Sequence, residues 1–216
     1  MMTDADGNQV MRRAIIRIVT AVLATVAIVG SLSVAADSPN AIIETSIVLL
    51  TEKLDGRKAE LSADRQSLYV LIDEILLPRF DRKFAAQVVL AKHWRSASEA
   101  QRARFIEAFY QALVRRYADG ILEFDPDKIK VLPYRGDESK PRTKVRSTIA
   151  MDDGSKVAVD YELVKRKVGW LLFNVVIEGV SYVRNFRAEL DAEIRSSSLD
   201  AVIARLEDEA DIAVDE

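Results

Sequence analysis

The residue types that most often carry catalysis are scarce in this chain. Its 216 residues include one histidine and no cysteine. The histidine, His93, lies next to Trp94, and one histidine without cysteine or a nearby pair of carboxylates does not make a metal site. We therefore expect His93 to pack at a helix end or at the surface and to bind no metal.

Serine and aspartate give no stronger indication of an enzyme. No serine lies in Gly-x-Ser-x-Gly, and residues 178–181 lack the first glycine of that turn. Asp152, Asp153, Asp125 and Asp127 have the pattern of turns in which aspartate accepts a hydrogen bond from its own backbone. A glycine-rich phosphate loop is also missing from the sequence. We predict no catalytic residue, no metal and no cofactor.

Two other classes of protein stay open. An enzyme acting on an apolar small molecule in a cone-shaped pocket would need a buried, inward-facing acid, and Asp73 and Asp160 are the candidates. Asp160 alternates with the apolar residues of its strand, which argues against it. The second alternative is an interaction protein with a filled core and no cavity.

The start of the chain resembles an export signal. Residues 11–17 are cationic, residues 18–29 form an apolar run, and residues 34–36 are small enough for cleavage by signal peptidase. We predict that residues 1–36 are a cleaved signal peptide, with Met11 as the alternative start. An uncleaved anchor is the other interpretation, but the apolar run is shorter than the roughly 20 residues of a membrane-spanning helix.

The rest of the chain has the length of a single domain, which we expect over residues 37–210, with an acidic tail over residues 211–216. Removing the signal takes away three arginines and two aspartates, so the net charge changes from −3 to −4. A nucleic-acid-binding domain normally has a strong basic excess, and we exclude that class. Without cysteine, the domain has neither disulfides nor thiol chemistry.

The first half of this domain has the apolar periodicity of helices. Three amphipathic helices are expected: one after Pro39, one that ends before Pro78 and one from Asp81. A capping box at residues 98–101 starts a long fourth helix, which should end near Gly120.

Aromatic residues widen the apolar faces of two of these helices. The third helix carries Phe84, Val88 and Ala91. Along the long helix, the residues that recur every four positions are Phe105, Phe109, Leu113 and Tyr117. Such a broad face needs a large apolar partner.

In the second half the apolar residues alternate with a period of two, as in strands. Residues 129–131 predict a short strand, and residues 140–151 and 157–163 predict a hairpin with the turn Asp153-Gly154. The apolar residues on one face of that hairpin are Val145, Ile149, Val157, Val159 and Tyr161.

The last predicted strand, residues 170–177, is apolar on both faces. It must be covered on both sides or line a cavity. We expect it to turn at Gly179 directly into a helix, and a run of serines should separate that helix from a final one.

This order of elements predicts an α+β domain, in which helices pack on a curved, mainly antiparallel, four-stranded sheet. The arrangement resembles nuclear-transport-factor-like folds, in which a cone encloses an apolar pocket. The residues expected to line such a pocket are Phe84, Val88, Phe105, Phe109, Leu113, Tyr117, Val145, Ile149, Val157, Val159, Tyr161, Trp170, Leu172, Val175, Ile177 and Val180. A filled core gives the same pattern, because periodicity does not distinguish a filled core from an open one.

Two stretches carry a resemblance to a known family. One comprises Leu77-Pro78 with residues 89–98 and 101–109, and the other runs over residues 170–181 into an arginine-bearing helix. Together they resemble the MlaC-type phospholipid-binding proteins of the Mla lipid-transport system, also known as toluene-tolerance proteins.

The chain departs from this family at two positions. Ala91 stands where the family commonly has glycine, and Asn174 where it commonly has aspartate. We expect the alanine to be harmless if the position is helical. The asparagine keeps the hydrogen bonding but loses the charge.

The resemblance implies a soluble periplasmic carrier, not an enzyme, that holds the acyl chains of a phospholipid in its interior with the head group near solvent. Its implied partners are an inner-membrane ABC transporter bearing MCE domains and an outer-membrane lipoprotein–porin complex. Its implied roles are outer-membrane lipid asymmetry and solvent tolerance.

Candidate contacts follow from this implied cargo. The phosphate has Lys144, Arg146 and the turn at residues 165–167 as weak candidates. Apolar residues are better candidates for the lining, in particular Val157, Val159 and Val180. Val180→Glu is predicted to fold but to lose lipid, because a charge in the lining opposes acyl binding.

Overall fold

A computed structural model describes residues 38–123 and 125–212 of the chain. The predicted signal peptide and residues 213–216 of the predicted acidic tail lie outside these residues. Of the helices that are described, none is long and apolar enough to cross a membrane.

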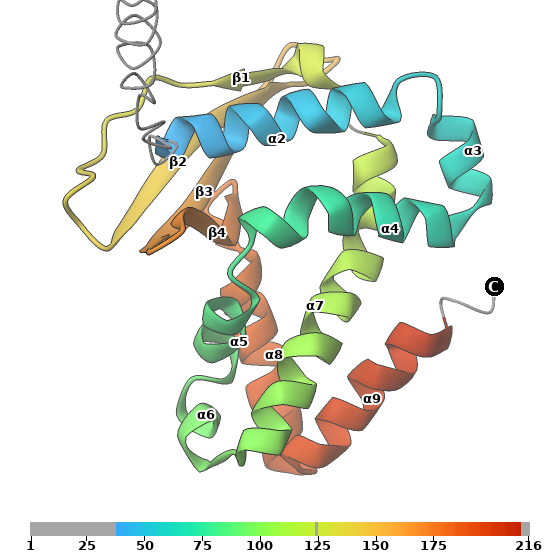
Figure 1. Ribbon diagram of the computed structural model, residues 1–216, viewed down its shortest axis with the longest axis vertical. Coiled ribbons are helices and arrows are strands. Elements are labelled where there is room, and N and C mark those ends of the chain that lie inside the picture. Colours follow the sequence, from blue (N-terminus) through green and yellow to red (C-terminus); the bar gives the residue numbers. More distant parts are fainter. Residues whose placement is uncertain (1–37, 124, 213–216) are drawn as a thin grey trace, which may run out of the picture. The chain divides into compact units, whose positions relative to one another are not determined.

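The first half of the described chain is helical, as the periodicity predicts (Figure 1). Its elements are α2 (Pro39–Leu54), α3 (Lys58–Ala63), α4 (Arg65–Leu76), the 3-10 turn η1 (Leu77–Arg79), α5 (Arg82–Leu90), α6 (Lys92–Ser96) and α7 (Glu99–Leu122). The capping box at the start of α7 is confirmed, with the Ser98 hydroxyl and the Gln101 side chain each accepting from the other's backbone N–H. α7 passes the predicted end at Gly120 by two residues.

Five strands form the second half, followed by two helices. The elements are η2 (Pro126–Lys128), β1 (Ile129–Val131), β2 (Arg142–Ala150), β3 (Lys156–Arg166), β4 (Gly169–Ile177), β5 (Val180–Ser181), α8 (Tyr182–Ser196) and α9 (Leu199–Ile212). The strands lie in sequence order and pair antiparallel. The α+β class and the meander are confirmed, and the predicted count of four strands is one short.

The additional strand is β5, which a tight turn joins to β4. Glu178 and Gly179 have φ values of 49° and 78°, as hairpin turns of two residues require. Val180 therefore pairs back on Ile177 before the chain becomes helical. The prediction of a helix directly after Gly179 is corrected by this hairpin. The Ser181 hydroxyl then accepts from the Arg184 backbone N–H and caps α8.

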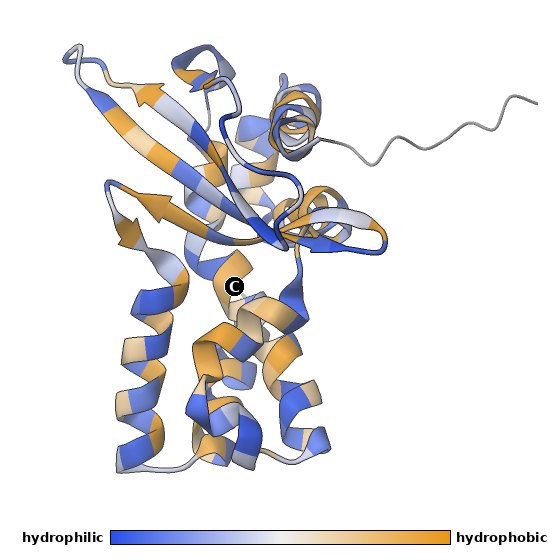
Figure 2. Ribbon diagram, turned by 90° about the vertical axis from the view of Figure 1, so that its left-hand side faces the viewer, coloured by the Kyte–Doolittle hydropathy of each residue, from blue (hydrophilic) through white to orange (hydrophobic). Residues whose placement is uncertain are grey.

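The sheet is covered on both faces of β4, as its apolar sequence predicts. On one face Trp170 packs against Ile43 of α2. On the other face Phe173 and Val164 pack into the core formed by α5, α7, α8 and α9. Figure 2 shows the sheet above these helices, with hydrophobic residues in bands along both.

A bulge in β4 keeps the apolar residues before it and after it on the same face of the sheet. The pairing shifts between Glu162 and Leu163, so that Phe173 is an extra residue in β4. Side chains alternate between the two faces of a strand, so after one extra residue the odd-numbered residues lie on the face that the even-numbered residues occupied before it. Trp170 and Leu172 before the bulge thus share a face with Val175 after it.

Candidate functional site

One face of the sheet collects the strand residues that the sequence predicts as a pocket lining. Residues paired directly across neighbouring strands point to the same face, and Val145 pairs with Tyr161, which pairs with Val175. The register places nine of the predicted residues on this face: Val145, Ile149, Val157, Val159, Tyr161, Trp170, Leu172, Val175 and Ile177. We call it the apolar face.

Helix α2 covers part of the apolar face. Ile43 forms a buried cluster with Val145, Leu163 and Trp170, and Ile47 packs against its edge. Figure 1 shows α2 lying across the strands. The sequence predicts an amphipathic helix after Pro39 but does not assign Ile43 and Ile47 to the site, because an apolar stripe alone does not reveal which surface it meets.

The cover is incomplete at the far end of the hairpin and along β4. Ile149, Val157, Val175 and Ile177 are only half-buried, whereas Val145 is 1 % exposed. Burial also raises the pKa of the Tyr161 hydroxyl on this face, so that group stays neutral. The uncovered part of the face is therefore apolar and uncharged.

An open hollow lies between α2, α3 and η2. It has a volume of about 480 Å³, within the range of small-molecule sites. Its lining residues are Thr51, Leu54, Asp55, Gly56, Lys58, Ala59 and Pro126. Pro126 belongs to η2, which leads directly into β1, where Ile129 pairs with Ile149 of the apolar face.

The predicted helical residues lie elsewhere. Phe105 and Phe109 are fully buried, with stacked rings whose centroids are 5.7 Å apart. They belong to the core of α5, α7, α8 and α9, and the other four helical candidates pack against that core: Phe84, Val88, Leu113 and Tyr117. Val180 on β5 pairs with Ile177 and extends the apolar face at its open edge, where it is 51 % exposed. The structure thus brings the strand residues together and groups the helical ones around a separate, filled core.

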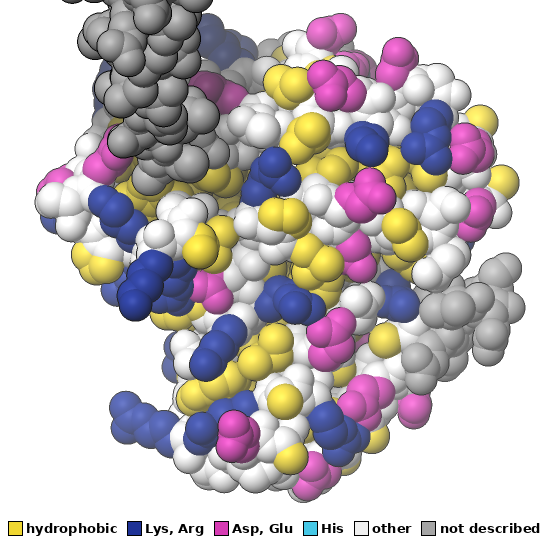
Figure 3. Space-filling view, in the orientation of Figure 1, with side chains coloured by type: hydrophobic (Ala, Val, Ile, Leu, Met, Phe, Trp, Pro, Cys, Tyr) yellow, Lys and Arg dark blue, Asp and Glu magenta, His cyan; other side chains and the backbone are white. Residues whose placement is uncertain are grey.

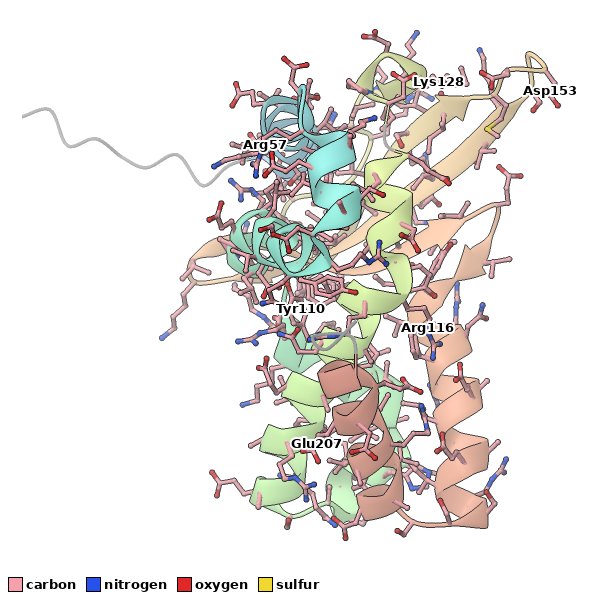
Figure 4. The ribbon with its side chains drawn as sticks, turned by 90° about the vertical axis from the view of Figure 1, so that its right-hand side faces the viewer. Arg57, Tyr110, Arg116, Lys128, Asp153 and Glu207 are labelled. Atoms are coloured by element: carbon pink, nitrogen blue, oxygen red, sulfur yellow. The ribbon has the colours of Figure 1, made fainter. Side chains whose placement is uncertain are left out.

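The acids proposed for an enzyme are engaged in other contacts. Asp160 pairs with Lys144 at 2.7 Å on the face opposite the apolar face. Asp73 accepts a hydrogen bond of 2.8 Å from Tyr110, which points from α7 towards α4 (Figure 4). Burial and this bond both raise the pKa of the Tyr110 hydroxyl. The pair therefore links two helices.

The phosphate candidates are spread over both faces. Lys144 and Arg146 alternate with the apolar face and lie opposite it. At the end of β3, Lys165 lies over the Trp170 ring at 5.4 Å, and Arg166 pairs with Asp81 at the start of α5. The structure does not gather these cations into one place.

Asn174 is the centre of a buried polar group. It is 4 % exposed, and its Nδ2 donates to the Glu162 carboxylate at 2.8 Å and to the Ser181 hydroxyl at 2.9 Å. Its Oδ1 accepts from the Val183 backbone N–H at 3.1 Å. The hydrogen bonding expected at this position is therefore present, and it connects β4 to the start of α8.

His93 joins two helices. Its Nε2 lies 2.7 Å from Asp191 of α8, which Lys92 also contacts at 2.8 Å. These neighbours lower the pKa of the Asp191 carboxyl to about 2, with the Lys92 hydrogen bond as the main cause and the His93 hydrogen bond as the next. Within residues 38–123 and 125–210, no group of three or more His, Cys, Asp or Glu side chains is placed to hold a metal ion.

Comparison with known proteins decides the family. The sequence model of the MlaC protein family matches residues 45–208, which is more than half of the chain. The chain belongs to the MlaC family. Among curated members, toluene tolerance protein ttg2D of Pseudomonas putida is 27 % identical over 157 residues, covering 72 % of this chain and 73 % of the relative. The intermembrane phospholipid transport system binding protein MlaC of Haemophilus influenzae is 21 % identical over 189 residues, covering 86 % and 88 %.

A solved structure shares the fold of this MlaC-family chain. It is the phospholipid-binding protein of Ralstonia solanacearum in complex with a phospholipid, with a TM-score of 0.70 and 21 % identity. The match covers 82 % of this chain and 98 % of that chain. The likeness supports the α+β architecture.

Proposed function

We propose that this protein is a periplasmic phospholipid carrier, and that the apolar face of the sheet holds the acyl chains. The observation that carries the proposal is the register, which aligns nine predicted lining residues on one incompletely covered face. Family membership supports it, and so does the Ralstonia solanacearum protein of the same fold, whose structure contains a phospholipid.

The proposed cargo explains why the face is large. Two acyl chains with about 28 methylenes, at about 0.8 kcal/mol each, cost roughly 22 kcal/mol when exposed to water. A carrier must therefore cover them almost completely. Its interior only has to match the bilayer, so loading and release stay reversible.

The hollow between α2, α3 and η2 is the proposed opening. Its lining residue Pro126 lies three residues before Ile129, which pairs with Ile149 at the half-buried end of the apolar face, and its rim carries both Asp55 and Lys58. A polar rim beside an apolar wall suits a ligand with apolar chains and a polar head. We assign the acyl chains to the apolar face and leave the helical core, around Phe105 and Phe109, as structural.

Export by the predicted signal peptide would place this carrier in the periplasm. There it would exchange lipid with an inner-membrane ABC transporter bearing MCE domains and an outer-membrane lipoprotein–porin complex, maintaining outer-membrane asymmetry. The names of the curated relatives, an intermembrane phospholipid transport protein and a toluene tolerance protein, support this assignment. An enzyme is not proposed, because Asp73 and Asp160 are both engaged in pairs.

The test is mass spectrometry of the periplasmic protein under native and denaturing conditions, with lipid identified in an organic extract. We expect near-stoichiometric phospholipid in the wild type and little in Val180→Glu and Ile177→Glu. Val168→Glu is the matched control, because Val168 is 83 % exposed in the turn before β4.

Using both Val180→Glu and Ile177→Glu keeps the test informative if one of them fails to fold. Val180 is half exposed, so Val180→Glu should fold even if Ile177→Glu does not. A folded Val180→Glu with normal lipid would contradict the placement of Val180 at the lining. A wild-type protein that carries no lipid and takes up none from vesicles would overturn the carrier function.

A further inference from the structure

A second hollow lies between α5 and α8, away from the apolar face. It has a volume of about 340 Å³, and its lining residues are Val89, Leu90, Ala91, Lys92, Arg184, Arg187, Ala188 and Asp191. Both helices pack on the Phe173 side of the sheet, opposite the apolar face. We call this hollow the α5–α8 groove.

The groove carries excess positive charge. Arg184 and Arg187 are exposed and lie three residues apart on one side of α8, and their guanidinium groups form no hydrogen bond or ion pair with any residue that the structure describes. Other arginines of the same region are paired, as Arg116 is with Glu189 at 3.2 Å. In Figure 3 dark blue side chains gather along the lower left edge, over α5 and α6.

The single acid among the groove residues is already neutralised. Asp191 contacts Lys92 at 2.8 Å, His93 at 2.7 Å and Arg195 at 3.4 Å. It therefore holds α6 against α8 and does not compete for Arg184 and Arg187. The walls of the groove are fixed, and two guanidinium groups remain without an anion.

The groove also contains a strained backbone. Ala91 has φ 48° and ψ −110°, a backbone conformation that residues other than glycine rarely adopt. Such conformations persist where the surrounding structure imposes them, and they concentrate at binding and catalytic sites. Here the bend ends α5 and brings Lys92 to the rim of the groove.

The geometry points to a phosphate-binding site in the α5–α8 groove, formed by Arg184 and Arg187, with Lys92 held at its rim by Asp191. Guanidinium groups pair with phosphate through two parallel hydrogen bonds. Val89 and Leu90 are 2 % and 1 % exposed, so the apolar lining residues that reach the surface of the groove are the small Ala91 and Ala188. Because both arginines are exposed on the outside of the domain, where they can meet a membrane surface, we assign the site to the head group of an anionic phospholipid rather than to free phosphate.

This site would orient the protein on an anionic membrane, independently of the lipid carried in its interior. The test measures binding of vesicles of phosphatidylcholine with and without phosphatidylglycerol, and of glycerol 3-phosphate and inorganic phosphate in solution. The variant is Arg184→Gln/Arg187→Gln. The matched control, Lys130→Gln/Arg142→Gln, removes two exposed cations that likewise form no ion pair with a described residue.

We expect the wild type and the control to bind vesicles only when phosphatidylglycerol is present, more weakly at high salt. Loss of both arginines should weaken this binding about 30-fold. All three proteins should carry the same lipid in their interior, which separates this site from the proposed carrier function.

The other outcomes are equally decisive. Binding of both soluble phosphates without binding of vesicles supports the phosphate site and assigns it to free phosphate. Equal binding by the arginine variant and the wild type overturns the site. No binding of any phosphate probe also overturns it, and an acidic protein surface then becomes the candidate for the groove.

Discussion

Ala91 shows how one residue departs from the pattern of its family. Sequence analysis expects the alanine to be harmless if its position is helical, but α5 ends at Leu90 and Ala91 has φ 48°. In this conformation the Cβ atom is crowded, and only glycine adopts it freely. The glycine that the resemblance leads us to expect here would match this backbone, and the alanine is strained.

Ala91→Gly should stabilise the protein by about 1 kcal/mol, because the relief of strain exceeds the entropy that glycine gains in the unfolded chain. The measurement is urea unfolding of both proteins. Ala103→Gly is the control: Ala103 is exposed within α7, where glycine should instead destabilise by about 1 kcal/mol. Two destabilised variants would mean that Ala91 is not strained.

Asn174 is the second position at which the chain departs from the expected residue, which is aspartate. Its neighbour Glu162 explains why asparagine is suited to this position. Its amide donates to the Glu162 carboxylate at 2.8 Å. An aspartate in its place would put two carboxylates in contact in a site that is 4 % exposed. The asparagine provides the donor that a carboxylate lacks.

Asn174→Asp should therefore destabilise the protein by about 1 to 3 kcal/mol at neutral pH. Adding Glu162→Gln should restore most of that loss, because the new amide can donate to the introduced carboxylate. Urea unfolding of the two single variants and the double variant measures the coupling. Additive effects of the two substitutions would contradict this explanation.

Short elements are where the sequence prediction fails. The helices α2, α4 and α7 follow from apolar periodicity, proline and the capping box. α3 has six residues and one buried side chain, Leu61, so its sequence shows no apolar repeat from which a helix could be predicted. β5 has two residues, and its existence depends on the positive φ of Glu178, which sequence patterns do not reveal.

For the site, periodicity predicts the strand residues well and the helical ones poorly. A strand presents only two faces, so alternation places Val145 and Val157 with little ambiguity. A long helix can bury one stripe against several partners. Phe105 and Phe109 are predicted to line the pocket with the strand residues, but they pack into the helical core on the other side of the sheet, with Phe173.

The contact between α6 and α8 gives a pH-dependent element. The pKa of the Asp191 carboxyl is lowered from 3.8 to about 2 by Lys92, His93 and Arg195. A carboxyl with a lowered pKa stabilises the fold above its ordinary pKa, and this contribution is lost as the pH falls through the folded value. The contact should therefore weaken between about pH 4 and pH 2.

Asp191→Asn should be less stable than the wild type at pH 6, and the difference should shrink as the pH falls towards 2. The asparagine cannot ionise, so only the wild type loses this contribution in acid. Chemical unfolding of both proteins across the acid range measures the difference. A difference that stays constant with pH would show that the charge of Asp191 does not stabilise the contact.

The described domain as a whole combines a filled part with an incompletely covered one. The helical core around Phe109 is fully buried, whereas the apolar face keeps Ile149 and Val175 half-buried. The two parts share β4, which contributes Phe173 to the first and Val175 to the second. A filled core on one side of β4 thus supports an incompletely covered face on the other.

Lipid should therefore stabilise the whole domain. A ligand that binds only the folded state at about 100 times its Kd adds about 2.7 kcal/mol. We expect solvent-extracted protein to unfold at a lower temperature, and phospholipid to restore the original value in the wild type and in Val168→Glu but not in Val180→Glu. Calorimetric unfolding curves test this, and identical curves before and after extraction would contradict it.

The bulge at Phe173 divides β4 into two stretches of opposite parity. Even-numbered residues point to the apolar face before the bulge, as Trp170 does, and odd-numbered residues do so after it, as Ile177 does. Deleting Phe173 would restore strict alternation, keep Val175 and Ile177 on that face, and remove the ring that packs into the helical core. A homologue with one residue fewer here would therefore present the same wall to its ligand and a different contact between β4 and the helices, so a gap at this position of an alignment marks a change in the scaffold and not in specificity.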